Sequence, residues 1–170
     1  YIDAVLKPKG LTPEVVSGGG TGTYASYEGL GFSEIQAGSY LFMDTAYQAI
    51  GDEKSDNENN QFDVSLKVLS TVVSHPTPER AVIDAGMKSL SIDLGMPKVE
   101  GNEKLIYKTG GDEHGIIHIT EGHAPLEIGQ QITLLPSHCD TTLNNFTTLY
   151  AVRGGEVIEE FPILGRGRSD

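Results

Sequence analysis

The sequence predicts an α+β fold that is mainly β, in which a short α/β segment precedes a β barrel or β sandwich. Three observations favour this fold. Residues 11–50 contain two short apolar runs that each end in small residues, as in the last units of a βα barrel or a doubly wound sheet. Residues 51–60 are polar, acidic and aperiodic. From residue 61 onward, runs rich in Val and Leu are divided by Gly, Pro and Asn, and no long helical pattern follows.

The first segment, residues 1–50, begins with YIDAVLKPKG, which is typical of the end of a helix that Gly10 caps. Because a domain rarely opens on the end of a helix, we expect the chain to be a fragment or to have lost its N-terminal part by cleavage. PEVVS predicts a strand, GGGTGTY a loop and ASYEGLGF a turn or irregular helix. SEIQAGSYLFMD predicts a second strand, and TAYQAIG a short helix capped by Thr45 and Gly51.

The rest of the sequence predicts a linker and a β domain. GDEKSDNENN, residues 51–60, predicts an exposed, mobile loop between domains 1–50 and 61–170. A metal site is the alternative for its acidic side chains, although they lack a fixed ligand spacing. Strands are expected in FDVSLKVLSTVVSH, RAVIDAG, KLIYK, HGIIHIT, QITLLPS and TTLYAV. YAVRGGEVIEEFPI predicts a hairpin with Gly154 and Gly155 at its turn.

The composition argues against several kinds of partner. The 170 residues include 24 acidic and 12 basic side chains, and the formal net charge of −12 disfavours nucleic acid and anionic membranes. No run approaches the ~20 apolar residues of a membrane span, and no signal-peptide pattern stands at the start. The single cysteine, Cys139, excludes an intrachain disulfide framework and favours a reducing compartment, so we expect a cytoplasmic protein.

The loop GGGTGT, residues 18–23, is a candidate phosphate cup. A strand that runs into glycines can direct backbone N–H groups at an anion, because glycine adopts positive φ and has no Cβ to block the approach. Gly20, Thr21, Gly22 and Thr23 are therefore candidate ligands. The loop lacks the lysine of a nucleotide P-loop and the full G-x-G-x-x-G spacing, so a plain turn is an equal alternative.

A second segment, EIQAGSY at residues 34–40, offers Gly38 and Ser39 at another strand end. If the two strands are neighbours at the C-terminal edge of a barrel, both loops can hold one phosphate. Gln36 lies two residues before Gly38 and shares its face in a strand, so its amide is a candidate contact for the ring that carries the phosphate. A surface amide is the alternative for Gln36.

The motif LLPSHCDTTLNNF, residues 134–146, contains the sharpest metal candidates, His138 and Asp140. In an extended backbone, residues two apart project to one face. The imidazole and the carboxylate would then form a two-point clamp with open positions for water or substrate, and Cys139 would point away. The alternative is a local turn that the residues DTT cap.

The remaining histidines carry less information. His75, His118 and His123 lie in turn or strand contexts, which favour structural roles. His114 follows two acidic residues and is a candidate for orienting a group or relaying protons, although a structural role is favoured here too.

Taken in order, VVSGGGTGTY, SEIQAGSYLFMD, GDEHGII, LLPSHCDTTLNN and GRGRS resemble the pyridoxal-phosphate enzymes of the D-threonine aldolase and D-serine dehydratase family. That family shares the fold of bacterial alanine racemase. The resemblance implies that residues 1–50 are the last strands of an α/β barrel of the TIM type and that residues 61–170 form the complete C-terminal β domain. The family's Schiff-base lysine lies on the first barrel strand. No lysine here has that context, so the chain alone should not catalyse.

The resemblance also implies the ligands. The loop from Gly20 to Thr23, with Gly38 and Ser39, resembles the phosphate cup, and Gln36 is a weaker candidate near the cofactor ring. His138 and Asp140 match the family's metal pair. Dehydratases of the family carry His-x-Cys, which suits zinc, whereas aldolases carry His-x-Asp, which suits manganese or magnesium. This chain has the aldolase version.

The implied reaction is cleavage of D-3-hydroxy amino acids to glycine and an aldehyde, with pyridoxal phosphate and a divalent metal. The metal would lower the pKa of the substrate hydroxyl, and the cofactor ring would store the electrons left on Cα. A dehydratase of D-serine or 3-hydroxyaspartate on the same scaffold is one alternative. A non-catalytic binding or regulatory domain is the other. A homodimer is expected, because the resembling fold commonly builds its site from two subunits.

Overall fold

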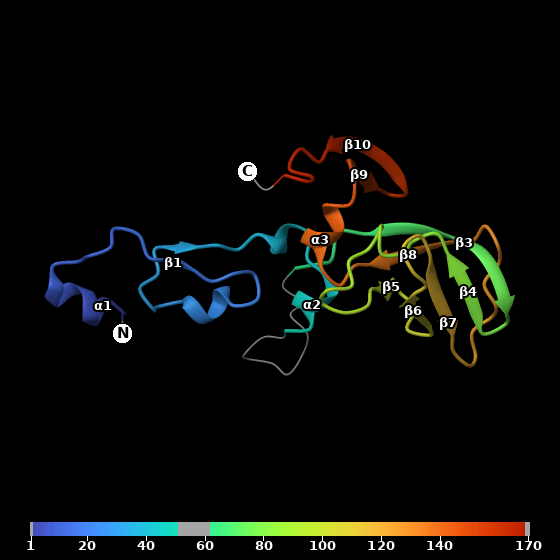
Figure 1. Cartoon of the computed structure of the whole chain (residues 1–170), viewed down its shortest axis with the longest axis horizontal. Helices are drawn as coiled ribbons and strands as arrows, with labels where there is room; N and C mark the ends of the chain where they lie inside the picture. Colours follow the sequence, from blue (N-terminus) through green and yellow to red (C-terminus); the bar gives the residue numbers. More distant parts are fainter. Residues whose placement is uncertain (1, 51–61, 169–170) are drawn as a thin grey trace. The chain divides into compact units, whose positions relative to one another are not determined.

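The computed structural model describes residues 2–50 and 62–168 (Figure 1). Two compact units make up the chain, Tyr1–Tyr40 and Leu41–Asp170. The expected linker, residues 51–60, lies outside the described residues. Residues 41–50, which the sequence grouped with the first segment, cluster with the second unit.

The first unit is built from short elements, namely α1 (Ile2–Leu6), η1 (Lys7–Lys9), β1 (Ser17–Gly18), η2 (Tyr24–Tyr27), β2 (Glu34–Ile35) and, at its end, η3 (Ser39–Leu41). The opening helical segment ends where expected, because Gly10 adopts φ 72° and donates its N–H to the Lys7 carbonyl. β1 and β2 pair in parallel, with Ser17 opposite Glu34. In the described residues of the first unit, these two strands form the sheet.

The strand expected over PEVVS is wrong for most of that run. The strand begins only at Ser17, and the side chain of Val15 is 59% exposed. The backbone of Val16 instead binds the side chain of Ser33, whose Oγ accepts a hydrogen bond from the N–H at 2.9 Å and donates one to the carbonyl at 3.2 Å. This use of the backbone at Val16 restricts β1 to two residues.

The second unit is mainly β. Its elements are α2 (Thr45–Gln48), β3 (Val68–Thr77), β4 (Arg80–Ile83), β5 (Lys98–Val99), β6 (Leu105–Thr109), β7 (Gly115–Ile119), β8 (Gln131–Leu135), α3 (Cys139–Leu143), β9 (Thr148–Arg153) and β10 (Glu156–Pro162). Six strands form one antiparallel sheet in the order β5-β8-β3-β4-β7-β6, and the edge strands β5 and β6 contact each other (Figure 1). The sheet is therefore a nearly closed barrel, which confirms a mainly β fold.

Alternation along the strands places the core inside this barrel. In β7, Ile117 and Ile119 are buried, whereas Ile116 and His118 are only half-buried. The largest buried side chain is that of Tyr107 on β6, whose hydroxyl donates to the Ala85 carbonyl at 3.0 Å. The five sheet strands expected from the sequence are confirmed. The two-residue β5 was not expected, because Lys and Val alone give no alternation.

The last two strands, β9 and β10, form a separate antiparallel hairpin, as predicted. Gly154 and Gly155 make its turn with φ 61° and 84°, the positive values that a two-residue turn of this kind requires. All residues of β10 are exposed, so the hairpin lies outside the barrel core. Among residues 2–50 and 62–168, no helix has the length and apolar character needed to cross a membrane.

Candidate functional site

Two loops of the first unit lie together because β1 and β2 are parallel neighbours. Residues 19–23 follow β1 and residues 36–39 follow β2, so both loops leave the same end of the pair. The Oγ1 atom of Thr21 joins them by accepting a hydrogen bond from the N–H of Tyr40 at 3.0 Å. Thr21 and Ser39 are both buried. The structure thus brings the two candidate phosphate loops together.

The first loop is a tight turn held by Thr23. The N–H of Gly20 donates to Thr23 Oγ1 at 3.1 Å, and the N–H of Thr23 donates to the Gly20 carbonyl at 3.0 Å. These two N–H groups are therefore used within the loop rather than directed at an anion, and Gly22 lies in the same turn. A Cβ atom at Gly20 or Gly38 would meet nothing within 4 Å, so open space lies beside the backbone at both positions.

The amide of Gln36 belongs to a chain of exposed hydrogen bonds. Its Nε2 donates to Ser17 Oγ at 2.9 Å, and that hydroxyl donates to Glu34 Oε1 at 2.6 Å. The backbone N–H of Gln36 binds the Gly19 carbonyl at 2.9 Å, which ties the second loop to the first. The side chain of Gln36 thus has a hydrogen-bond partner on β1.

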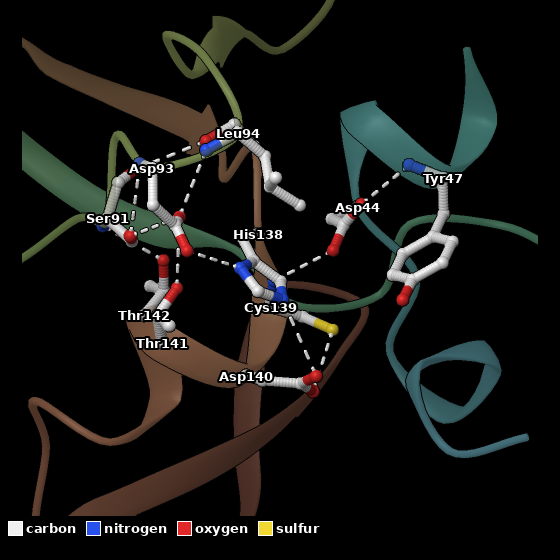
Figure 2. A network of polar contacts seen from close by, with 11 residues as sticks. Asp44, Tyr47, Ser91, Asp93, Leu94, His138, Cys139, Asp140, Thr141 and Thr142 are labelled. Carbon is white, nitrogen blue, oxygen red and sulfur yellow. Dashed lines mark hydrogen bonds and ion pairs between the residues drawn. The ribbon is translucent and has the colours of Figure 1, made fainter. Parts of the chain in front are cut away.

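His138 and Asp140 lie where an extended residue meets the start of a helix. His138 is the N-cap of α3, with φ −142° and ψ 116°, and Cys139 is the first helical residue. The expectation of an extended backbone through Asp140 is therefore wrong. The two side chains nevertheless face each other, with His138 Nε2 3.5 Å from Asp140 Oδ2 (Figure 2). They do so because an N-cap side chain lies over the first turn of its helix.

Helix α3 begins at Cys139 because a distant carboxylate caps it. Asp44 Oδ2 accepts a hydrogen bond from the N–H of Cys139 at 2.8 Å, and Asp44 Oδ1 accepts one from the N–H of Tyr47 in α2 at 2.8 Å (Figure 2). Asp44 is 0% exposed, so one buried carboxylate caps both helices. The cap that the sequence assigned to Thr45 is wrong, because Asp44 is the N-cap of α2.

Asp93 holds the imidazole of His138 from its other nitrogen. His138 Nδ1 lies 2.7 Å from Asp93 Oδ2 (Figure 2). The other oxygen, Oδ1, accepts hydrogen bonds from Ser91 Oγ at 2.5 Å, the Leu94 N–H at 3.1 Å and Thr141 Oγ1 at 3.3 Å. These three hydrogen bonds fix the orientation of the Asp93 carboxylate independently of the imidazole. Because Asp93 contacts Nδ1, Nε2 is the ring nitrogen that faces Asp140.

The charges of this cluster favour the ionised forms of its members. Burial alone would lower the pKa of His138, but the hydrogen bond and charge of Asp93 and the charges of Asp140 and Asp44 outweigh it and raise the pKa. Burial alone would raise the pKa of Asp93, but hydrogen bonds from Ser91, His138 and Thr141 and the charge of His138 outweigh it and lower the pKa. The carboxylates around the imidazole therefore favour a positive charge, whether that of a proton or of a cation.

Cys139 does not offer a thiolate to this cluster. The residue is 0% exposed, and burial together with the charges of Asp140 and Asp44 raises the pKa of its thiol to about 12. Its Sγ lies 3.4 Å from Asp140 Oδ1. A protonated, buried thiol is a poor metal ligand, because the thiolate is the form that binds metal.

The donor set fits a divalent ion bound by two side chains. Ligand atoms about 2.1 Å from one ion lie roughly 3.0–3.5 Å apart, and the Nε2 and Oδ2 atoms of the pair are 3.5 Å apart. Imidazole nitrogen with carboxylate oxygen suits manganese, magnesium or zinc. Within the part of the chain that the structure describes, no group of three or more His, Cys, Asp or Glu side chains could hold a metal.

The other histidines lie away from this pair. His123 Nε2 accepts a hydrogen bond from the side-chain amide of Asn102 at 2.8 Å, and its Nδ1 donates one to the Ala124 carbonyl at 2.5 Å, which is a structural role. His114 is exposed in the turn between β6 and β7, and its carbonyl accepts a hydrogen bond from Gly110. Sequence reasoning missed Asp93 and Asp44, since they lie 45 and 95 residues from their partners and form no local motif with them.

Comparison with known proteins places the chain in a family. Residues 65–152 match the family described as "Putative serine dehydratase domain". The chain belongs to this family. The matched residues include the barrel strands, His138 and Asp140, and this result confirms the resemblance inferred from the sequence motifs.

Known proteins match almost the whole length of this chain. A 3-hydroxy-D-aspartate aldolase of Paracoccus denitrificans (strain Pd 1222) is 39% identical over 169 residues, which are 98% of this chain and 43% of that protein. The structure of D-threonine aldolase from Filomicrobium marinum is 36% identical, with a TM-score of 0.86, and matches 97% of this chain and 45% of that chain. The chain thus spans less than half the length of these two family members.

A dehydratase with the same fold is also similar. The structure of D-threo-3-hydroxyaspartate dehydratase from Delftia sp. HT23 is 28% identical, with a TM-score of 0.75, and matches 94% of this chain and 46% of that chain. Two variants of D-threo-3-hydroxyaspartate dehydratase have also been solved. In one, a cysteine is replaced by alanine and the protein is in the metal-free form; in the other, a histidine two residues earlier is replaced by alanine.

Proposed function

We propose that this chain is the C-terminal part of a lyase that depends on pyridoxal phosphate and a divalent metal and cleaves D-3-hydroxy amino acids to glycine and an aldehyde. The observation that carries the proposal is the 3.5 Å approach of His138 Nε2 to the Asp140 carboxylate, in a family whose members include aldolases for such substrates. The histidine and the cysteine that are replaced in the dehydratase variants lie two residues apart. His138 and Asp140 have the same spacing, with a carboxylate in place of the thiol.

In this proposal each unit supplies one ligand set. The parallel pair β1–β2 would present Gly22, Gly38 and Ser39 to the cofactor phosphate, as the last part of a TIM-type barrel within residues 1–50. The β domain, residues 61–170, would carry the metal pair. When bound, pyridoxal phosphate supplies a sink for the electrons released at Cα, and a divalent ion polarises the β-hydroxyl of the substrate.

The side chains of the β domain then have distinct tasks. His138 and Asp140 would hold the ion. Because Asp140 is negatively charged, it would bind the cation more strongly than a neutral ligand. The hard carboxylate favours Mn²⁺ or Mg²⁺ over Zn²⁺. Cys139 stays protonated and buried, so it cannot replace Asp140 as the second ligand.

A dehydratase of 3-hydroxyaspartate or D-serine is the second candidate, and the similarity to the Delftia dehydratase favours it. The same pair would then help hydroxide to leave instead of aiding cleavage of the Cα–Cβ bond. The carboxylate at Asp140 favours the aldolase. A third reading, a non-catalytic domain of the family, requires that no Schiff-base lysine accompanies the chain in the complete protein. A small-molecule D-amino acid is the proposed partner, and a homodimer is the proposed assembly.

The test uses the complete enzyme that carries this chain. D-threonine turnover is measured after chelation and after the return of single metals, in the native enzyme and in His138→Ala and Asp140→Ala. We expect Mn²⁺ to restore turnover only in the native enzyme, while the pyridoxal absorbance persists in all three. Asp140→Cys should shift the metal preference toward Zn²⁺. Full turnover in a strong chelator would remove the metal pair from the mechanism, and release of 2-oxobutanoate from D-threonine, in place of glycine and acetaldehyde, would favour the dehydratase.

A further inference from the structure

The two oxygens of Asp93 have separate partners (Figure 2). Oδ1 accepts from three donors, namely the hydroxyls of Ser91 and Thr141 and the N–H of Leu94. Oδ2 lies 2.7 Å from His138 Nδ1. Because all three groups at Oδ1 are donors, that position requires an acceptor, and the orientation of the carboxyl group is fixed by the loop and helix around it.

We propose that Asp93 is a positioning residue that sets the tautomer of His138, so that Nδ1 carries the hydrogen and Nε2 presents its lone pair toward Asp140. The inference rests on the proposed metal site. A neutral imidazole has one N–H and one acceptor nitrogen, and the partner of one nitrogen decides the state of the other. A carboxylate at Oδ2 only accepts, so it selects the hydrogen on Nδ1. Partners of this kind orient metal-binding histidines and raise their affinity for the ion.

The division of labour at Asp93 makes Asp93→Asn a sharp test. The three donors at Oδ1 keep the amide oxygen in that position, which turns the amide NH₂ toward His138. The NH₂ group donates to Nδ1, so the hydrogen of the imidazole moves to Nε2 and blocks the nitrogen that would bind the ion. Asn has nearly the shape of Asp, so a merely structural role of Asp93 would survive this substitution better than Asp93→Ala.

The experiment compares the complete enzyme with Asp93→Asn, Asp93→Ala and His138→Ala. Mn²⁺ affinity is measured from the electron paramagnetic resonance signal of free Mn²⁺, and the tautomer of His138 is read from its ring ¹⁵N shifts in metal-free protein at a pH where the ring is neutral. We expect Asp93→Asn to weaken Mn²⁺ binding by about 10- to 100-fold and at least as much as Asp93→Ala does. We also expect its ¹⁵N shifts to report the hydrogen on Nε2.

Asp84→Asn is the matched control. The carboxylate of Asp84 also accepts from a hydroxyl and a backbone N–H, those of Ser70 and Thr71, each at 2.8 Å. This variant should lower thermal stability without changing Mn²⁺ affinity or the His138 tautomer. If Asp93→Asn binds Mn²⁺ as the native enzyme does, the inference is wrong although the metal site stands. If His138→Ala also binds Mn²⁺ as the native enzyme does, the proposed metal site itself is wrong.

Discussion

The carboxylate of Asp44 binds the backbone N–H of Cys139 at 2.8 Å, across 95 residues of sequence. Its other oxygen caps α2, so one buried side chain fixes the start of two helices. The start of α3 in turn sets where Asp140 lies relative to His138. The geometry of the candidate metal pair therefore depends on a residue far away in the chain.

Replacing Asp44 should destabilise the second unit strongly. Asp44→Ala removes both caps and leaves two N–H groups without their acceptor, and we expect a loss of about 2–4 kcal/mol in the free energy of unfolding. Asp44→Asn keeps one acceptor but turns an NH₂ group toward the other N–H, so it should also destabilise. Urea denaturation measures the change. Glu159→Gln, the control, removes one negative charge from the exposed strand β10 and should leave the free energy of unfolding within about 0.5 kcal/mol of the native value. If Asp44→Ala and Glu159→Gln had equal effects, Asp44 would not cap both helices.

Gly38→Ala tests the proposed phosphate cup without disturbing the fold. A Cβ at Gly38 meets no atom within 4 Å, and its φ is not in the left-handed region. Stability should therefore be unchanged, whereas the methyl group would occupy space next to the phosphate. We expect pyridoxal phosphate to bind the complete enzyme about tenfold more weakly, equivalent to about 1.4 kcal/mol. Gly165→Ala, which has equally open surroundings, is the control. Unchanged cofactor affinity in Gly38→Ala would place the phosphate elsewhere.

Tyr107 should couple stability to alkaline pH. Burial raises the pKa of its phenol above the usual value near 10. Because the folded-state pKa is the higher one, the stabilisation is complete below the unfolded pKa and is lost as the pH rises through the folded pKa. Absorbance at alkaline pH should show one tyrosine that ionises only as the β barrel unfolds. Tyr107→Phe should abolish this late step and cost about 1 kcal/mol at neutral pH, because the hydrogen bond to Ala85 is lost. Seven phenols that all titrate in the folded protein would contradict the burial.

Cys139 should resist thiol reagents in the folded protein. The residue is 0% exposed and its pKa is raised to about 12, so the thiolate is scarce at pH 8. Labelling with a chromogenic disulfide should be slow in buffer and fast in denaturant, with one thiol per chain. Cys139→Ser serves as the blank. Rapid labelling of the folded protein would mean that the thiol is available to a metal, and the argument against a cysteine ligand would fail.

The sequence predicted those features that depend on local pattern. Alternating apolar side chains predicted the barrel strands, and two glycines predicted the turn between β9 and β10. It failed where distant groups decide the backbone. An extended run through Asp140 was expected, but the carboxylate of Asp44 turns Cys139 into the first residue of a helix. The spacing of His138 and Asp140 was informative all the same, because a cap residue and the second residue of its helix also lie close together.

Asp93 marks the limit of motif reasoning in the same way. Nothing near SIDLG suggests a partner for an imidazole, since the contact joins the loop before β5 to the start of α3, 45 residues later. Such pairs depend on how the strands of the barrel bring loops together. The loops are distant in sequence, so a local motif does not predict that they are neighbours. Long-range carboxylate contacts around a motif are therefore the part of this site that required the structure.

The central claim, that His138 and Asp140 hold one divalent ion, is tested most directly by anomalous X-ray diffraction from crystals of the complete enzyme grown with Mn²⁺. We expect one anomalous peak at the start of α3, about 2.1 Å from both His138 Nε2 and an Asp140 oxygen, with Asp93 still bound to Nδ1. The peak should vanish in crystals of Asp140→Ala. A peak held by other residues, or full occupancy in Asp140→Ala, would show that His138 and Asp140 are not the metal pair.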